Sequence, residues 1–221
     1  MSASEIRALA VQAGIGPGVT VLDLCCGVAG PGRFLTRELG CVYAGVDASA
    51  SAVAIARERA GDLPCRFTVA RVPPLPAGPF DVVLLLETML AFEDKDALVR
   101  EVAATLAPGG RFAITLEEGQ PLTAAERAAM PDADTVWLTP LEEIEAMLTR
   151  VGLVVTSRED HSGAHRAIAQ SLARAFADDA EWIAAEIGRR ALDELLAAHR
   201  LWVDWLDAGR VRKLAVVAEL S

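Results

Sequence analysis

The sequence predicts an α/β protein built on a doubly wound, mostly parallel sheet of seven strands. Short apolar runs alternate with helical patterns five times, which is typical of parallel strands joined by crossover helices. Hydrophobic residues make up 52% of the 221 residues and aromatic residues only 5%. A core filled by Ala, Leu and Val suits helices packed on buried parallel strands. A helical insertion of about 50 residues before the last strand is longer than a usual connection.

The expected strands are short runs rich in apolar and β-branched residues, bounded by turn residues. The run at 80–86 is apolar along nearly its whole length, so we expect it at the centre of the sheet. The seven strands are expected at residues 19–24, 41–46, 65–69, 80–86, 111–116, 152–157 and 212–220.

The expected helices show apolar residues every three or four positions. Gly40 closes the helix that carries Phe34, and Ser49 can cap the next one. Asp178-Asp179 or Gly188 is expected to divide the long last stretch into two helices, whereas the segment 117–139 is expected to be irregular. The other helices are expected at 2–14, 50–60, 96–106, 140–151 and 163–208. We expect one domain over residues 1–221, in which 160–208 form a helical lid.

Charge argues against a nucleic-acid partner. The formal net charge is −10, Lys95 and Lys213 are the only lysines, and no run of Lys and Arg occurs. A nucleic-acid binder needs a basic face to replace counterions. The partner expected instead is a small molecule, whereas the oligomeric state is left open.

The four cysteines do not form a disulfide framework, and no Cys/His group has zinc spacing. The N-terminus lacks the basic and apolar regions of a secretion signal, and no apolar stretch is long enough to span a membrane. We therefore expect a cytoplasmic protein that has no membrane partner and no metal.

A glycine-rich turn follows the first strand, and Asp47 ends the second. Backbone amides at a helix N-terminus can approach a ligand closely there, and a carboxylate suits paired ribose hydroxyls. Both features lie at the carboxyl edge of the sheet, where open α/β folds bind ligands. Enzymes that use NAD share this pair of features, although the strict Gly-x-Gly-x-x-Gly pattern is absent.

Four segments of the sequence narrow the choice of cofactor. Their sequences resemble the motifs of class I S-adenosylmethionine-dependent methyltransferases, in the order of that family, over about residues 10–120. The segments are residues 19–27 (VTVLDLCCG), 45–49 (GVDAS), 80–87 (FDVVLLLE) and 106–112 (LAPGGRF). The resemblance implies a seven-stranded sheet with an antiparallel last strand. It also implies S-adenosyl-L-methionine as cofactor, S-adenosyl-L-homocysteine as product and methyl transfer to an O, N or C atom of a small molecule.

The resemblance also implies which residues bind the cofactor. Cys25 and Ala29 stand where the family's loop has its first and third glycines, and no acidic residue follows the third strand. We expect adenine to meet backbone groups and the apolar face of Val72, with Arg71 nearby. Asp23 either binds nearby loop amides or belongs to the site. The expected cofactor-binding residues are Cys25, Cys26, Gly27, Asp47, Ala48, Arg71, Val72 and Glu87.

Thr88 and Met89 follow the central strand and are expected to border the methyl group and the substrate. Glu117 follows the fifth strand at the same edge and is also expected to bind the substrate. With its neighbour Glu118 it could hold a cationic or amine substrate, although a solvated charge pair is the alternative reading.

His161 and His165 are the candidate catalytic residues and further candidate substrate contacts. Their spacing places them on one helical face, and histidine can act as a base near neutral pH. Capping or packing is the alternative role for both, and His199 is expected to be structural. No third ligand suggests a metal beside the pair. Cys25 and Cys26 have no identifiable base partner, so they are expected to be small loop residues.

Three other functions share parts of this pattern. An NAD(P)-dependent oxidoreductase would share the turn and Asp47. An S-adenosylmethionine-binding protein that is not a methyltransferase would share the whole cofactor half, and a non-catalytic relative would retain binding without turnover.

Overall fold

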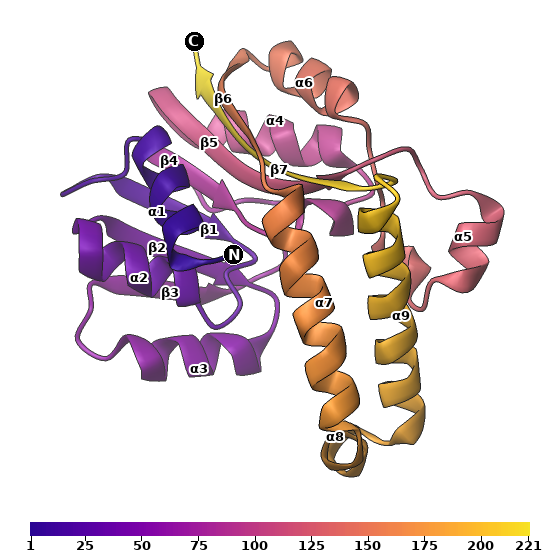
Figure 1. The fold of residues 1–221 in the computed structure, drawn as a ribbon. Helices are drawn as coiled ribbons and strands as arrows, with labels where there is room; N and C mark the ends of the chain where they lie inside the picture. Colours follow the sequence, from indigo (N-terminus) through magenta and orange to yellow (C-terminus); the bar gives the residue numbers. More distant parts are fainter.

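The computed structural model describes residues 1–221 and contains one seven-stranded sheet in the order β3-β2-β1-β4-β5-β7-β6 (Figure 1). The first five strands are parallel, and β7 runs antiparallel to both β5 and β6. The predicted fold class, with its antiparallel last strand, is therefore confirmed. The strands are β1 (Thr20–Leu24), β2 (Val42–Asp47), β3 (Cys65–Val69), β4 (Phe80–Leu85), β5 (Leu106–Glu118), β6 (Leu153–Asp160) and β7 (Arg212–Leu220).

Strand β4 lies at the centre of the sheet, as its apolar sequence predicts, between β1 and β5. From β1 the chain adds β2 and β3 on one side and then crosses to add β4 on the other. The strand order therefore reverses between β1 and β4. In open α/β sheets a crevice opens at the carboxyl ends of the strands at such a point, and ligands bind there.

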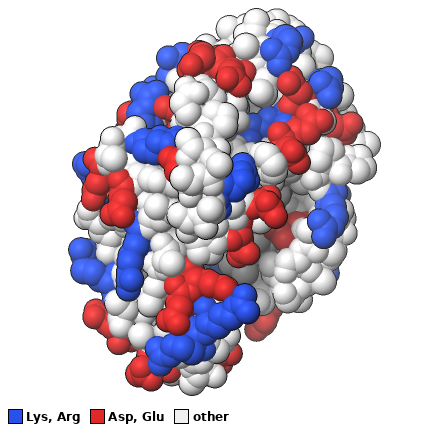
Figure 2. All heavy atoms as spheres, turned by 90° about the vertical axis from the view of Figure 1, so that its right-hand side faces the viewer, with Lys and Arg blue, Asp and Glu red and all other residues white.

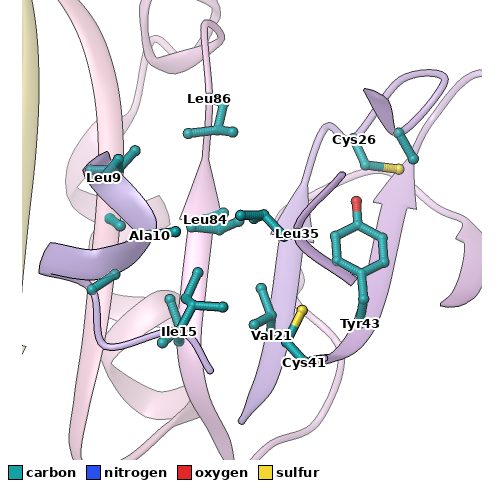
Figure 3. Close-up of a cluster of buried hydrophobic side chains, with 14 of the residues drawn as sticks. Leu9, Ala10, Ile15, Val21, Cys26, Leu35, Cys41, Tyr43, Leu84 and Leu86 are labelled. Carbon is teal, nitrogen blue, oxygen red and sulfur yellow. The ribbon is translucent and has the colours of Figure 1, made fainter. Parts of the chain in front are cut away.

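Helices cover both faces of the sheet because alternate side chains along each strand point to opposite faces. Val21 and Leu84 pack toward α1, α2 and α3, whereas Leu22 and Leu85 pack toward α4 and α6. Figure 3 shows the first of these cores, in which Leu35 of α2 lies against the sheet. The helices are α1 (Ala3–Gln12), α2 (Gly30–Leu39), α3 (Ala50–Ala60), α4 (Lys95–Thr105), α5 (Ala124–Ala129), α6 (Leu141–Arg150), α7 (Ser162–Asp178), α8 (Ala180–Ile187) and α9 (Arg189–Asp207).

Strand β5 begins five residues earlier than predicted. Phe80 pairs with Leu106 and Val82 pairs with Arg111, so the Pro108-Gly109-Gly110 segment forms an irregularity within the strand. The expectation that this segment lies between helix and strand was wrong, because Leu106 already has an extended backbone (ψ 146°). A bulge of this kind lets glycine take the left-handed conformation that Gly109 shows (φ 72°).

The predicted irregular segment 117–139 also contains regular structure. Strand β5 continues through Glu118, and a capping box between Thr123 and Glu126 starts the short helix α5. A single turn of 3₁₀-helix follows at Ala133–Thr135. Six-residue helices are too short to show a clear apolar period, which explains why the pattern missed α5.

The helical stretch before β7 is divided at both predicted break points, so it forms three helices and not two. Asp179 separates α7 from α8, and Gly188 separates α8 from α9 with a backbone (φ 89°) that glycine adopts easily. Helices α7 and α9 lie side by side and project away from the sheet, with α8 at their far end (Figure 1). A small core that includes Trp205 and Met130 joins this insertion to the segment after β5.

Acidic and basic side chains are interspersed on the face beside α9 and α5, which Figure 2 presents to the viewer. The structure contains no helix that combines the length and the apolar character needed to cross a bilayer.

Candidate active site

The candidate site lies where β1, β2 and β4 end. Three residues other than glycine have left-handed backbones at this edge: Cys25 (φ 57°), Ala29 (φ 53°) and Glu87 (φ 63°). Each such residue costs about 1–2 kcal/mol because Cβ crowds the following carbonyl oxygen. Cys25 and Ala29 are the two positions where the sequence departs from the expected glycines, so the loop keeps a glycine-like conformation there. Backbone strain of this kind is characteristic of functional sites.

Asp47 joins the loop after β1 to the end of β2. Its Oδ2 atom accepts a hydrogen bond from the amide of Gly27 at 2.8 Å, and its Oδ1 atom accepts one from the amide of Ser49 at 2.8 Å. Each carboxylate oxygen has a second lone pair, which remains available to a ligand hydroxyl. Asp47 lines a pocket of about 220 Å³ together with Cys25, Ala48, Ala70, Arg71, Val72 and Pro73.

A second pocket, of about 400 Å³, lies beyond Cys25, which lines both. Its lining includes Ile6 of α1, the buried Asp23 of β1, and Glu87. Seven of the eight residues expected to bind the cofactor line one of these two pockets, and the eighth, Gly27, donates its amide to Asp47.

Asp23 receives a hydrogen bond from a buried tyrosine. The hydroxyl of Tyr43 donates to Oδ2 of Asp23 at 2.5 Å, and Figure 3 shows this hydroxyl pointing toward the loop that carries Cys26. Burial raises the pKa of Asp23 to about 7, although the tyrosine hydrogen bond opposes the shift. Asp23 therefore titrates near neutral pH at the floor of the second pocket.

A buried ionic cluster lies beside this pocket and consists of Glu87, Glu117, His165 and Lys213. Lys213 of β7 is only 2% exposed, and its Nζ atom lies 2.6 Å from Oε1 of Glu117 and 2.9 Å from Oε1 of Glu87. The antiparallel register places Lys213 opposite Glu117 of β5. Nε2 of His165, on α7, lies 3.8 Å from the same Oε1 atom of Glu117. Strands β5 and β7, helix α7 and the segment after β4 thus bring their titratable groups together.

The groups of this cluster have opposite pKa shifts. For Glu87, burial is outweighed by the charge and hydrogen bond of Lys213, so its pKa lies below the ordinary value. For the more deeply buried Glu117, burial wins over Lys213 and raises the pKa. Burial, helped by the positive charge of Lys213, lowers the pKa of His165. His165 is therefore predominantly neutral at neutral pH and able to accept a proton.

A third pocket, of about 220 Å³, opens on the other side of the cluster, between the sheet and the helices α7 and α9. Glu117 and His165 form its polar end. Oε2 of Glu117 and Oγ1 of Thr88 are both buried without a hydrogen-bond partner, an uncommon state for buried polar atoms. The remaining lining residues are Leu90, Ile168, Ala169, Leu172, His199 and Trp202.

A comparison with known protein families indicates which kind of site lies at this edge of the sheet. A family model described as a methyltransferase domain matches residues 21–110, which run from β1 into β5 and include the whole lining of the pocket at Asp47 and most of that of the second pocket. Over these residues the chain matches the class I S-adenosylmethionine-dependent methyltransferases. The predicted family and its cofactor, S-adenosylmethionine, are confirmed.

Curated methyltransferases resemble the chain most clearly over this part. The methyltransferase GfsG of Streptomyces halstedii is 36% identical over 106 residues, which cover 45% of this chain and 38% of that protein. The chain spans about a fifth to two fifths of the length of the first curated relatives that it matches.

Solved structures share the fold over nearly the whole chain. The cyclopropane synthase MmaA2 from Mycobacterium tuberculosis has a TM-score of 0.89 at 14% identity, covering 98% of this chain and 83% of that one. A phosphoethanolamine N-methyltransferase 2 from Haemonchus contortus, in complex with phosphomonomethylethanolamine and S-adenosylhomocysteine, has a TM-score of 0.83 at 22% identity. That match covers 99% of this chain and 52% of that one.

The two cofactor-side pockets fit the parts of S-adenosylmethionine. The pocket at Asp47 offers a carboxylate for ribose hydroxyls and the side chains of Arg71 and Val72 beside an adenine. The pocket at Asp23 and Glu87 offers carboxyl groups to the ammonium of the methionine part. Together they lie within the volume range of small-molecule sites.

The two candidate histidines face different carboxylates. His161 caps α7 without a side-chain capping bond, and its ring lies 3.0 Å from Glu159 and 3.7 Å from Glu5. His165 faces Glu117. Helical spacing thus places both near the sheet edge but brings only His165 into the ionic cluster. Nδ1 of His199 donates a 2.8 Å hydrogen bond to the carbonyl of Leu195, and the ring packs against Phe176 and also lines the third pocket.

The residues that follow β4 and β5 divide between the site and the core. Thr88 carries a buried, unpartnered hydroxyl beside the site. Met89 is 1% exposed and packs in the core beneath the sheet edge. Glu118 is buried, forms an ion pair with Arg212 and accepts from the amide of Leu141 at 3.2 Å, so it points away from Glu117 and is not solvated. The reading of Glu117 and Glu118 as a solvated pair was therefore wrong.

Cys25 and Cys26 are small loop residues, as expected. Burial raises the pKa of Cys25 to about 11 and that of Cys26 to about 12, in surroundings that also contain Asp23 and Asp47. Neither thiol is ionised at neutral pH, so the electrostatic environment does not favour a nucleophilic role.

The sequence analysis did not identify Lys213 as part of the candidate site. Its sequence position, inside an apolar strand, carries a signal: a lysine in a buried strand needs an ionic partner. The identity of that partner depends on the β5–β7 register. Glu87, Glu117 and His165 place one potential ligand atom each within 4.8 Å of one another. An ion there would have to displace Lys213, which already supplies the positive charge.

Proposed function

We propose that this chain transfers the methyl group of S-adenosylmethionine to a small molecule held between the sheet edge and the helices α7–α9. One observation carries the proposal: the ionic cluster stands between the cofactor-side pockets and the third pocket. Glu87 lines the second pocket, and Glu117 and His165 line the third. Proton-accepting groups therefore separate the expected methyl donor from the expected acceptor.

Each cofactor-side residue has a proposed role. Asp47 binds the ribose hydroxyls with its free lone pairs, while its amide bonds keep the loop after β1 in place. Val72, with Ala48, contacts the adenine ring, and Arg71 lies at its edge. Cys25, Cys26 and Gly27 let the loop backbone approach the cofactor, and Glu87 faces its methionine part.

Bound S-adenosylmethionine supplies an electrophilic methyl carbon whose bond to sulfur breaks while the electron pair stays on sulfur. The protein must align the acceptor with that carbon and take up the acceptor's proton. We assign proton uptake to Glu117 and His165, which face the third pocket, and acceptor contacts to them and to Thr88. We propose that His161 holds the start of α7, because both of its ring nitrogens face carboxylates.

We propose that the chain acts as a single domain in which residues 160–208 form a lid over the acceptor. Helices α7 and α9 supply six of the eight residues that line the third pocket. The partner proposed is a small molecule, with no role assigned to nucleic acid or a membrane. The four free cysteines support a reducing compartment, the cytoplasm.

Isothermal calorimetry with S-adenosylmethionine, S-adenosylhomocysteine and NAD tests the cofactor assignment. We expect the first two to bind and NAD not to bind. Asp47→Asn should weaken binding of S-adenosylhomocysteine by about 10–100-fold, because an amide group would oppose the N–H of Gly27 or Ser49. The exposed Asp62→Asn is the matched control and should change nothing.

Binding of NAD in place of S-adenosylhomocysteine would overturn the assignment in favour of an oxidoreductase. Transfer itself is tested with S-adenosylmethionine labelled in its methyl group, followed by mass spectrometry of the products of an amine, phenol and carboxylate panel. Cofactor binding with no labelled product from any acceptor would favour a binding protein or another chemistry on the same fold.

A further inference from the structure

We propose that the acceptor is an apolar amine, which binds as an ammonium ion against Glu117 while its hydrocarbon part fills the pocket between the sheet edge and α7–α9. This inference rests on the proposed function, because it names the substrate class of the same site. It follows from three features of that pocket: its shape and apolar walls, the charge of its polar end, and its lack of a free basic side chain.

The pocket is apolar except at one end. Leu90 follows β4, Ile168 and Leu172 come from α7, and Trp202 comes from α9, whereas Glu117 and His165 form the polar end. His199 and Trp202 also line an adjacent pocket of about 310 Å³ that reaches Met130 and Val136. A ligand with one polar terminus and an apolar body matches this arrangement.

The polar end carries one negative charge too many. Lys213 contributes a single positive charge within hydrogen-bond distance of two carboxylates, Glu87 and Glu117. His165 does not correct the balance, because burial and Lys213 lower its pKa and favour the neutral ring. The amino terminus and Glu5 of α1 also act on His165, with opposite signs. With both glutamates ionised, the four side chains of the cluster carry a net charge of −1. The amino terminus acts on Glu87 from the side of the second pocket, whereas burial raises the pKa of Glu117.

The cluster also lacks one hydrogen-bond donor. Lys213 donates to Oε1 of Glu117, whereas Oε2 of Glu117 has no partner although only 4% of this side chain is exposed. A buried carboxylate oxygen without a donor is costly. An ammonium group at the polar end of the pocket would supply the missing donor and the missing positive charge together. A neutral hydroxyl would supply only the donor.

A phosphorylated amine does not fit this pocket. None of its lining residues is Lys or Arg. Arg210 and Arg212 lie where the helical insertion meets β7, and both already form ion pairs, Arg210 with Glu126 and Arg212 with Glu118. A phosphate group would face apolar walls and a surplus negative charge. The acceptor class therefore differs from the phosphomonomethylethanolamine bound in the Haemonchus contortus structure.

The transfer step balances with the residues present. The bound ammonium gives one proton to Oε2 of Glu117 and becomes a neutral amine with a free electron pair. That pair forms a bond to the methyl carbon as the carbon–sulfur bond breaks, and the sulfur keeps the electrons of the broken bond. The nitrogen now carries the methyl group and the positive charge. The product leaves as a methylammonium ion after the proton on Glu117 passes to water.

Calorimetry on protein saturated with S-adenosylhomocysteine tests the proposal at pH 7.5. The probes are 2-phenylethylamine, 2-phenylethanol and phosphoethanolamine. The amine should bind at least about tenfold more tightly than the alcohol, and phosphoethanolamine should not bind measurably. In Glu117→Gln the amine should lose at least about tenfold in affinity, whereas the affinities for the alcohol and for S-adenosylhomocysteine should not change. Glu118→Gln, one residue along the strand and directed away from the pocket, should leave amine binding as in the wild type.

Leu172→Arg provides a second variant that leaves the buried cluster intact. Leu172 is 42% exposed on α7, so an arginine can be accommodated, and its positive charge at the pocket wall should reduce amine affinity. Equal affinity for amine and alcohol, undiminished amine binding in both variants, or no amine binding at millimolar concentration would overturn the proposal. Loss of S-adenosylhomocysteine binding would instead overturn the proposed function. The same titrations on the free protein keep the two outcomes distinct.

Discussion

The Nζ atom of Lys213 lies 2.6 Å from Oε1 of Glu117, and this pair joins β7 to β5 in the interior of the protein. Glu87 forms the third member at 2.9 Å. Each charge alone would be strongly destabilised by its loss of water, so the arrangement persists only because the partners are present together. Lys213 therefore holds two acidic groups close together at the boundary between the cofactor-side and acceptor pockets.

Lys213→Met should destabilise the protein strongly. Removal of the ammonium leaves the buried carboxylate of Glu117 and the partly exposed one of Glu87 without a cation, for which the expected loss in free energy of unfolding is about 3–5 kcal/mol. The loss should be larger at pH 8 than at pH 5. Without Lys213 the carboxylates have folded-state pKa values above their unfolded values, so the folded state is favoured at low pH and loses stability as pH rises. Urea denaturation at both pH values measures this.

Arg190→Met is the control for that variant, because Arg190 pairs with Glu194 on the exposed surface of α9. Exposed pairs contribute little to stability, so this substitution should have almost no effect at either pH. A loss in Lys213→Met that is equally small would contradict the role of Lys213 as an internal counter-ion.

Asp23 should make the stability of the protein depend on pH between about 4 and 7. Burial raises the pKa of Asp23 from 3.8 to about 7, so the folded protein holds a proton that the unfolded chain releases in this range. The contribution of Asp23 is fully present below pH 4 and is lost as pH rises through 7. Asp23→Asn removes this titration and can still accept from Tyr43. The variant should gain about 2–4 kcal/mol relative to the wild type between pH 5 and pH 8.

Denaturation at each pH unit from 4 to 8 gives the free energy of unfolding as a function of pH, for the wild type and for Asp23→Asn. Their difference isolates Asp23 from the other titrating groups. Parallel curves would show that Asp23 has the same pKa in both states. Tyr43→Phe serves as a comparison, because it removes the 2.5 Å hydrogen bond but leaves the carboxyl group.

The fold was predictable because its determinants are local. The β3, β7 and α3 boundaries agree with the expected ranges 65–69, 212–220 and 50–60, where apolar period, Gly and capping residues lie in the sequence itself. The loop after β1 and Asp47 were predictable for the same reason, since a turn and a strand end adjoin in sequence. The division into three helices was only partly predictable. The sequence offers Asp179 and Gly188 as possible breaks, but it does not show that the chain breaks at both.

The acceptor side was less predictable because its parts come together through tertiary packing. Lys213 meets Glu117 only through the β5–β7 register, and Glu87 joins them from the segment that follows β4. The i, i+4 spacing of His161 and His165 placed both near the site. Which carboxylate each ring faces depends on how α7 leaves β6 and on Glu5 of α1. Local patterns carry no information on such contacts.

The thiols of Cys25 and Cys26 should react slowly with iodoacetamide. With pKa values of about 11 and 12, both are almost entirely protonated at pH 8. Alkylation should be at least about tenfold slower than that of an ordinary free thiol and should accelerate by about tenfold per pH unit up to pH 10. Peptide mass spectrometry after timed alkylation measures each site. Both cysteines should react at ordinary rates in guanidinium, and fast alkylation of the folded protein at pH 7 would contradict their raised pKa values.

Gly32→Ala should destabilise the protein although alanine favours helices. Gly32 lies in α2, where the helix propensity of alanine alone would add about 1 kcal/mol of stability. A Cβ atom there would lie only 2.0 Å from Cζ of Tyr43 and 2.3 Å from its hydroxyl. The ring must move, and with it the hydrogen bond to Asp23, so a net loss of about 1–3 kcal/mol is expected from overpacking.

Gly30→Ala in the same helix is the matched control, because a Cβ atom at Gly30 meets nothing within 4 Å. Without ligand it should be neutral or slightly stabilising in thermal and urea denaturation. Only Gly32→Ala should also strengthen the pH dependence that Asp23 confers, because only there is the tyrosine hydrogen bond lost, and that bond opposes the raised pKa of Asp23. If the two alanine variants had equal stability, the close packing of α2 on Tyr43 would not be what holds the tyrosine hydroxyl against Asp23.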